Sequence, residues 1–191
     1  MMTLETNQTS PTKSAVPSSK YFPTHDLESA PAEARPFLEE TERRFGFIPL
    51  ASARHATAPA VVEGFGLLHG VFEKTSLSPL EREAIALVLA AKLDCKLCRE
   101  LHKRMARHQG ATAELVEALL ARRDISDPKL RTLAEFTERA VDTRGEVSDA
   151  ELEGFIDAGF SPRQALEVVV GIATYTLSIF ANRMTRSETV R

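Results

Sequence analysis

The sequence predicts an all-α fold. Segments with apolar residues at helical spacing recur along the chain, and several of them start with Ser or Asp followed by Pro, a pattern typical of a helix start. No segment alternates apolar and polar residues as a half-buried strand does. We expect helices at residues 32–45, 58–75, 79–92, 95–109, 112–122, 128–144, 149–158 and 162–184.

Capping signals fix the starts of several of these helices. In a capping box, a Ser and a Glu or Gln three residues later each accept a hydrogen bond from the other's backbone N–H. Such pairs are Ser78 with Glu81, Ser148 with Glu151, and Ser161 with Gln164. Asp127 before Pro128 opens a further helix, and Gly110 lies where the helix ending near Gln109 stops.

The Ser-Pro pairs at 78 and 161 each precede a long apolar helix. Two interpretations stay open. The chain contains two degenerate helical repeats, the second with Ser178 and Ala181 where an offset alignment would place cysteines, or Ser-Pro is simply a common helix start.

Composition divides the chain into two parts. Residues 1–28 are rich in Ser, Thr, Pro and Lys and show no helical period, which predicts a flexible N-terminal arm. Residues 29–191 are expected to form a single helical domain. The overall 43% hydrophobic and 27% charged content is that of a globular domain with a substantial core.

Charge and hydropathy restrict the partners. A net charge of −3 argues against a nucleic-acid partner. The first twenty residues lack a secretory signal, and the longest apolar stretch, 166–181, is shorter than the ~20 residues of a membrane span. We therefore expect a cytoplasmic protein without a membrane partner. The apolar helices at 58–75 and 162–184 predict a homo-oligomer, because one small domain cannot cover all of their surface.

The chain has two cysteines, Cys95 and Cys98, and this spacing is typical of redox or metal chemistry rather than of a disulfide scaffold. On a helix, Cys95, Cys98 and His102 share one face. A cysteine near a helix N-terminus is stabilised as a thiolate by the helix dipole. Asp94 can serve as the N-cap of this helix, although its charge works against the thiolate and is offset locally by Lys96 and Arg99.

Glu83 lies twelve residues before Cys95, which on one unbroken helix would separate them by about 18 Å. If the chain instead reverses near Leu93 and Asp94, Glu83 and His102 face each other on neighbouring antiparallel helices. A carboxylate beside a histidine fixes its tautomer and raises its basicity. The pattern therefore predicts a Glu83–His102 pair that relays protons to the cysteines.

Glu83, Cys95, Cys98 and His102, at this spacing, resemble the alkylhydroperoxidase D signature of the carboxymuconolactone decarboxylase superfamily. Segments 45–49, 77–86 and 166–172 are similar to its peroxidase-related branch, and the resemblance spans roughly residues 30 to 185. It implies a compact multi-helix bundle that oligomerises. It also implies a thiol-dependent hydroperoxide reductase that needs no cofactor and uses a small hydroperoxide and a dithiol or protein thiol.

The resemblance also implies roles for the site residues. Peroxide attacks Cys98, Cys95 resolves the product as a disulfide, and Glu83 and His102 relay protons. Helix geometry alone favours Cys95 as the more acidic thiol. We adopt the family assignment because His102 is one turn from Cys98. Leu97 departs from the family, whose members often carry His or Tyr there.

Alternatives remain at this stage. They are a catalytically weak or inactive helical oligomer, a lactone-processing relative, a zinc site built from the two cysteines, His102 and a fourth ligand, and two merely buried cysteines. The lactone decarboxylases of the superfamily do not depend on this cysteine pair, so its presence argues against that branch. Tyr175, Asn182 and Arg183 are expected to serve packing and the subunit surface.

Overall fold

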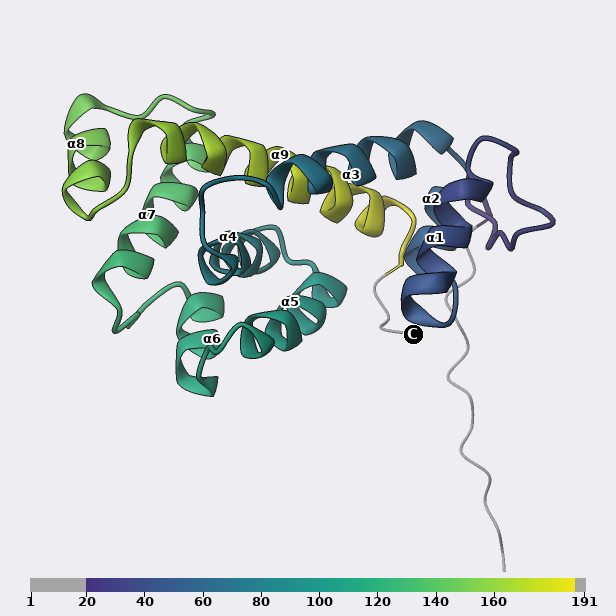
Figure 1. Ribbon diagram of the computed structural model, residues 1–191, viewed down its shortest axis with the longest axis horizontal. Coiled ribbons are helices and arrows are strands. Elements are labelled where there is room, and N and C mark those ends of the chain that lie inside the picture. Colours follow the sequence, from purple (N-terminus) through teal and green to yellow (C-terminus); the bar gives the residue numbers. More distant parts are fainter. Residues whose placement is uncertain (1–19, 188–191) are drawn as a thin grey trace, which may run out of the picture.

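The computed structural model describes residues 20–187, and every regular element within them is an α-helix (Figure 1). The predicted all-α fold is confirmed. Residues 1–19 of the predicted arm lie outside the described residues. The helices are α1 (Arg35–Phe45), α2 (Leu50–His55), α3 (Pro59–Phe72), α4 (Pro79–Lys92), α5 (Lys96–His108), α6 (Ala113–Ala121), α7 (Pro128–Asp142), α8 (Asp149–Asp157) and α9 (Pro162–Met184).

The eight predicted helices are all present, and their ends agree with the prediction to within three residues. The short helix α2 was not predicted. It has six residues, begins after Pro49 and has no side-chain cap at its start, so neither periodicity nor a capping motif marks it. The capping boxes form as predicted at the starts of α4, α8 and α9, and Asp127 caps α7 through the N–H of Leu130.

Helix α4 lies at the centre of the molecule, where it contacts α5, α6, α7 and α9. In Figure 1, α3 and α9 form a layer on one side of it, and α5 and α6 lie on the other. Every residue from Glu83 to Ala90 is buried. A helix that is apolar around its whole circumference is stable only when neighbours cover all of its sides. Glu83, one of the few ionisable groups on α4, is therefore placed inside the core.

Helix α9 runs along α3 and α4 and also contacts α7, α8 and α2. It is the one helix within residues 20–187 whose length and composition would allow it to cross a membrane, and 39% of its most apolar window is buried. Gly171 lies at its closest approach to the rest of the core, beside the side chains of Phe72 and Ile85. One side of α9 thus belongs to the core and carries side chains toward α4 and α5.

The N-terminal helices form a smaller cluster at one end, to the right in Figure 1. Ala30, Ala34 and Leu38 pack together there with Ala56. Arg54, which is buried, donates from Nη1 to the carbonyl oxygens of Thr185 at 2.8 Å and Arg186 at 3.1 Å. These bonds tie α2 to the end of α9, across about 130 residues of sequence.

Candidate active site at the α4–α5 turn

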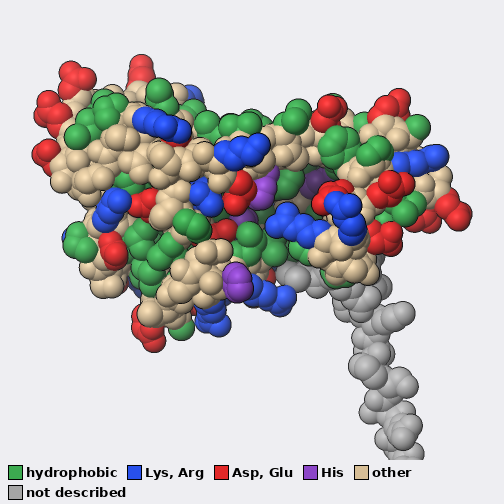
Figure 2. Space-filling model, in the orientation of Figure 1, with side chains coloured by type: hydrophobic (Ala, Val, Ile, Leu, Met, Phe, Trp, Pro, Cys, Tyr) green, Lys and Arg blue, Asp and Glu red, His purple; other side chains and the backbone are tan. Residues whose placement is uncertain are grey.

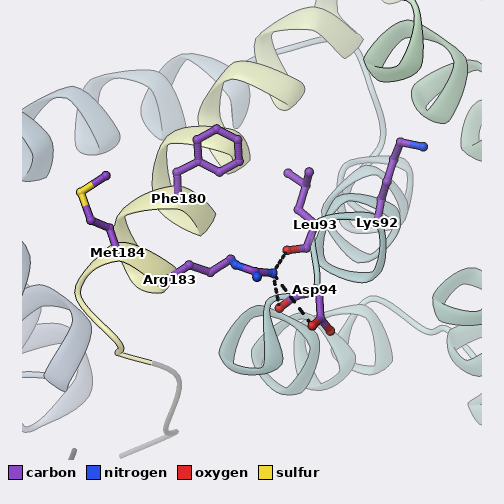
Figure 3. Close-up of a pocket in the computed structure, with 6 residues that line it drawn as sticks. All are labelled: Lys92, Leu93, Asp94, Phe180, Arg183 and Met184. Carbon is purple, nitrogen blue, oxygen red and sulfur yellow. Dashed lines mark hydrogen bonds and ion pairs between the residues drawn. The ribbon is translucent and has the colours of Figure 1, made fainter.

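The chain reverses between α4 and α5, as the sequence predicts. Asp94 has a φ of 52°, in the left-handed region, which lets three residues connect the two helices. Arg183 of α9 holds this turn: its Nη1 donates to the carbonyl oxygens of Leu93 at 2.5 Å and Asp94 at 3.0 Å (Figure 3). Arg99 of α5 holds it from the other side, through the carbonyl oxygen of Ala91 at 3.0 Å.

The predicted N-cap of α5 is wrong. Cys95, not Asp94, caps the helix, and its sulfur accepts the backbone N–H of Cys98 at 3.2 Å. An N-cap residue needs an extended backbone, which Cys95 has and Asp94, at positive φ, does not. The carboxylate of Asp94 instead pairs with Arg99 at 3.0 Å. The backbone N–H of Cys98, in the first turn of α5, therefore bonds to a sulfur rather than to a carboxylate.

Cys95 and Cys98 form a disulfide at this helix start. Cys95 is completely buried and Cys98 has 4% of its surface exposed. Leu97, between them, is half-buried against the core. Of the two residues, Cys98 is the more exposed.

Glu83 and His102 form the predicted pair. Nδ1 of His102 and Oε2 of Glu83 are 2.8 Å apart, and both residues are 5% exposed. Because Glu83 accepts the hydrogen of Nδ1, Nε2 is the ring nitrogen left to take up and release a proton. The interaction is buried, so little solvent screens it. The arrangement can hold an imidazole in one tautomer and supply protons one helical turn from Cys98.

The ring of Tyr175, from α9, packs edge-on against His102 with ring centres 4.9 Å apart. Burial and then the charge of Glu83 raise the pKa of Tyr175 above its ordinary value. The phenol therefore stays neutral throughout the physiological range. Tyr175 limits the orientation of the imidazole, a packing role consistent with the prediction.

Asn182 was not predicted as a site residue. It was expected to serve packing or the subunit surface, but it is 5% exposed and its Nδ2 lies 3.4 Å from Sγ of Cys98 and 3.9 Å from Sγ of Cys95. The sequence holds one indirect signal, an amide in an otherwise apolar stretch of α9. Its approach to cysteines 84 and 87 residues away depends on how α9 packs.

Two pockets flank these residues. One, of about 570 Å³, lies beside the α4–α5 turn and is lined by Phe180, Arg183 and Met184 among others (Figure 3). The other, of about 400 Å³, has Glu83 in its wall. Basic side chains gather around that second pocket, namely Arg44, His69, Arg82, Arg104 and His108. Figure 2 shows histidine and basic side chains in the hollow between α3 and α5.

Within residues 20–187, no three or more His, Cys, Asp or Glu side chains are grouped closely enough to hold a metal ion. Cys95, Cys98 and His102, the ligands of the zinc alternative, are thus not grouped in this way. The geometry instead combines a cysteine pair, an oriented histidine and an amide donor. The catalytic roles of Glu83, Cys95, Cys98 and His102 stay predictions.

Residues 64–139 match the model of the Carboxymuconolactone decarboxylase family, and they include the α4–α5 turn, both cysteines, Glu83 and His102. The matched segment is similar to that family, and the fold of the chain is alkylhydroperoxidase D-like. The resemblance stated from the sequence is therefore confirmed. No curated protein sequence matches the chain significantly.

Solved structures with a similar fold align with nearly the whole chain. The alkylhydroperoxidase AhpD core of an uncharacterized peroxidase-related protein from Ralstonia eutropha JMP134 is 21% identical, with a TM-score of 0.78, covering 89% of this chain and 92% of that one. An uncharacterized peroxidase-related protein from Silicibacter sp. TM1040 is 22% identical, with a TM-score of 0.72 and 95% of both chains covered. The debrominase Bmp8, solved as a variant in complex with 2,3,4-tribromopyrrole, is 15% identical, with a TM-score of 0.70, covering 91% of this chain and 92% of that one.

Proposed function

We propose that the protein is a thiol-dependent hydroperoxide reductase that cycles between a Cys95–Cys98 dithiol and a disulfide. The observation that carries the proposal is the buried Glu83–His102 pair, at 2.8 Å, one helical turn from a cysteine pair that forms a disulfide. A base oriented by a third group is the arrangement that activates a nucleophile. A buried disulfide without a function would not require it.

The proposed cycle uses the two cysteines and His102, and an external thiol closes it. His102 takes the proton of the Cys98 thiol, and the thiolate attacks the hydroperoxide, forming an S–O bond while the O–O bond breaks. The departing alkoxide takes that proton from His102 and leaves as the alcohol. Cys95 then attacks the sulfenic acid at Cys98, and the S–S bond forms with loss of water. A dithiol or protein thiol supplies the two electrons that restore both thiols.

Accessibility supports the attack at Cys98. Cys98 is 4% exposed and Cys95 is completely buried, so a peroxide reaches Cys98 first. The amide of Asn182 also lies closer to Cys98, at 3.4 Å against 3.9 Å. The backbone N–H of Cys98 instead stabilises the sulfur of Cys95, which suits a resolving thiolate.

The partners proposed are a small hydroperoxide and a thiol reductant. The cytoplasm is the proposed location, because its thiol pools can regenerate the dithiol. The catalytic unit is proposed to be a homo-oligomer.

The proposal is tested by following consumption of an organic hydroperoxide with a dithiol donor. We expect turnover by the parent protein and none by Cys98→Ser. Cys95→Ser should instead accumulate a sulfenic acid that a dimedone-type probe labels. Labelling at Cys95 in the Cys98→Ser variant would reverse the two roles. No peroxide consumption by the parent would favour the inactive-oligomer or lactone-processing alternative.

A second electron acceptor belongs in the same experiment. Because the fold is shared with the debrominase Bmp8, the reduced protein should also be presented with 2,3,4-tribromopyrrole. Faster disulfide formation with the bromopyrrole than with a hydroperoxide would move the assignment from peroxide reduction to reductive dehalogenation.

A further inference from the structure

Within residues 20–187, the side chain of Asn182 donates hydrogen bonds to the redox sulfurs alone. It projects from the last turn of α9 and is 5% exposed. Nδ2 lies 3.4 Å from Sγ of Cys98, within hydrogen-bonding distance for a sulfur acceptor. Among the described residues, Oδ1 of Asn182 has no hydrogen-bond partner although it is buried.

This arrangement costs stability. A buried carbonyl oxygen without a partner carries an uncompensated desolvation penalty. Hydrogen bonds to a neutral sulfur are weak. A side chain that only filled space here would be better replaced by an apolar one. The benefit of the amide must therefore appear in a state of the cysteines that demands a donor.

We propose that Asn182 is a catalytic residue whose Nδ2–H donates to the sulfur of Cys98 and stabilises the negative charge on that sulfur in the reduced protein. A hydrogen bond to a charged acceptor is about twice as strong as one between neutral groups. The contact strengthens when the disulfide opens to a thiolate. Asn182 thereby favours the nucleophilic form of Cys98.

The amide acts alongside other groups around the sulfurs. Those that can carry charge are His102 and Glu83 from α5 and α4, Asp94 on the turn, Lys96 and Arg99 on α5, and Arg183 on α9. Arg99 and Arg183 are both engaged with Asp94 and with carbonyl oxygens of residues 90–94. His102 is engaged with Glu83. Among the described residues, Asn182 is the one side chain that donates an N–H hydrogen bond to the sulfur of Cys98.

The inference concerns the same site as the proposed reductase but is tested without peroxide. In a Cys95→Ser background, Cys98 is the sole thiol, and the pH dependence of its alkylation by iodoacetamide reports its pKa. Asn182→Leu, which removes the donor at similar volume, should raise that pKa by about 1 to 2 pH units. Asn182→Asp, which replaces the donor by a carboxylate, should raise it at least as far, through like-charge repulsion.

A matched control and a second measurement complete the test. Thr174→Val removes another buried polar group of α9, whose hydroxyl bonds to the carbonyl oxygen of Val170. It should leave the Cys98 pKa unchanged. In the protein with both cysteines, Asn182→Leu should form the disulfide about tenfold more readily against a glutathione buffer, because its dithiol form loses a stabilising contact.

The results distinguish the role of Asn182 from the proposed hydroperoxide reductase activity. An unchanged Cys98 pKa and an unchanged redox equilibrium in both Asn182 variants would overturn the inference, even if the parent consumes peroxide. The expected shifts in a parent that consumes no peroxide would uphold the inference while the reductase proposal fails. A Thr174→Val shift as large as that of Asn182→Leu would also overturn it, because general loosening of α9 would then be the cause.

Discussion

The carboxylate of Glu83 lies 2.8 Å from Nδ1 of His102, although nineteen residues separate the two along the chain. Both are 5% exposed, one on α4 and one on α5, on either side of a three-residue turn. A buried charge is retained only when it is paired. The turn, and the arginines that hold it, therefore determine whether Glu83 and His102 can meet.

Replacing Glu83 with Gln should slow thiol chemistry while the fold stays intact. The amide keeps the shape of the side chain but removes the carboxylate charge that holds Nδ1 of His102. A positioned acid–base group contributes about 10²–10⁴-fold, so peroxide-driven disulfide formation should fall by that factor. Stopped-flow measurement of thiol loss checks it.

The matched control for that variant is Glu73→Gln. Glu73 lines the same pocket as Glu83 but pairs with Arg82 rather than with His102. Its loss should leave the rate of disulfide formation nearly unchanged. Equal rates for Glu83→Gln and the parent would contradict the relay.

His55 makes stability depend on pH. Burial lowers its pKa to about 4, against a smaller raising effect of its hydrogen bond to the backbone of Ala181. Because the folded pKa is below the unfolded value, the unfolded chain binds more protons between these two values. Stability is then full above the unfolded pKa and falls as pH drops toward 4.

From pH 7 to pH 5, His55 should cost about 2 kcal/mol of unfolding free energy. Urea unfolding of the parent and of His55→Gln at both pH values gives the change in unfolding free energy between pH 7 and pH 5. This change should be larger in the parent than in His55→Gln. His108→Gln, a change at the exposed end of α5, should lose as much unfolding free energy between pH 7 and pH 5 as the parent does. An equal loss of stability between pH 7 and pH 5 in the parent and in His55→Gln would rule out a neutral His55 in the folded protein.

Gly171 allows α9 to approach α3 and α4. A Cβ at this position would lie 2.8 Å from ring carbons of Phe72 and 3.1 Å from Cγ2 of Ile85. Because Phe72 is completely buried, Gly171→Ala should destabilise the protein by about 1–3 kcal/mol in urea unfolding.

Gly154→Ala in α8 is the control for that substitution. No atom lies within 4 Å of the Cβ it would add, so it should raise stability by up to about 1 kcal/mol. If both alanine variants shift the unfolding midpoint in the same direction, the close approach at Gly171 is not limiting.

Local signals in the sequence predicted most of the fold. Ser78, Ser148 and Ser161 act within one helical turn, so their capping boxes do not depend on the rest of the chain. The Glu83–His102 contact was also predictable, because one reversal sufficed to place it. Whether the chain contains two degenerate repeats stays a prediction.

The parts that were missed depend on longer-range packing or on backbone detail. Asn182 reaches the sulfurs only because α9 packs across α4. Cys95 rather than Asp94 is the N-cap of α5, because Asp94 adopts a positive φ. The residue type of Asp94 allows this conformation but does not require it. Helix α2 lacks both a capping box and a clear apolar stripe.

Exposed apolar side chains on α3 and α9 lead us to expect a homo-oligomer. Leu67 and Leu166 are 64% and 72% exposed, and Val71 and Val169 are more than half exposed. Sedimentation velocity should show an oligomer of the parent at micromolar concentration. Combined Leu67→Glu and Leu166→Glu should shift it toward monomer, because buried charges oppose association.

Ile156→Glu serves as the control for the oligomer, since it changes an exposed apolar residue of α8. It should leave the sedimentation coefficient unchanged. A stable monomer of the parent protein would contradict the expected assembly. The exposed apolar side chains of α3 and α9 would then not mark a subunit interface.

The most direct test of the reductase account is a single turnover of fully reduced protein with one equivalent of an organic hydroperoxide. Intact mass and product analysis should show a loss of about two mass units per chain, as Cys95 and Cys98 join, and one equivalent of the corresponding alcohol. Reductant should restore the original mass. Unchanged protein with intact hydroperoxide, or only irreversible oxygen additions without an internal disulfide, would contradict the account.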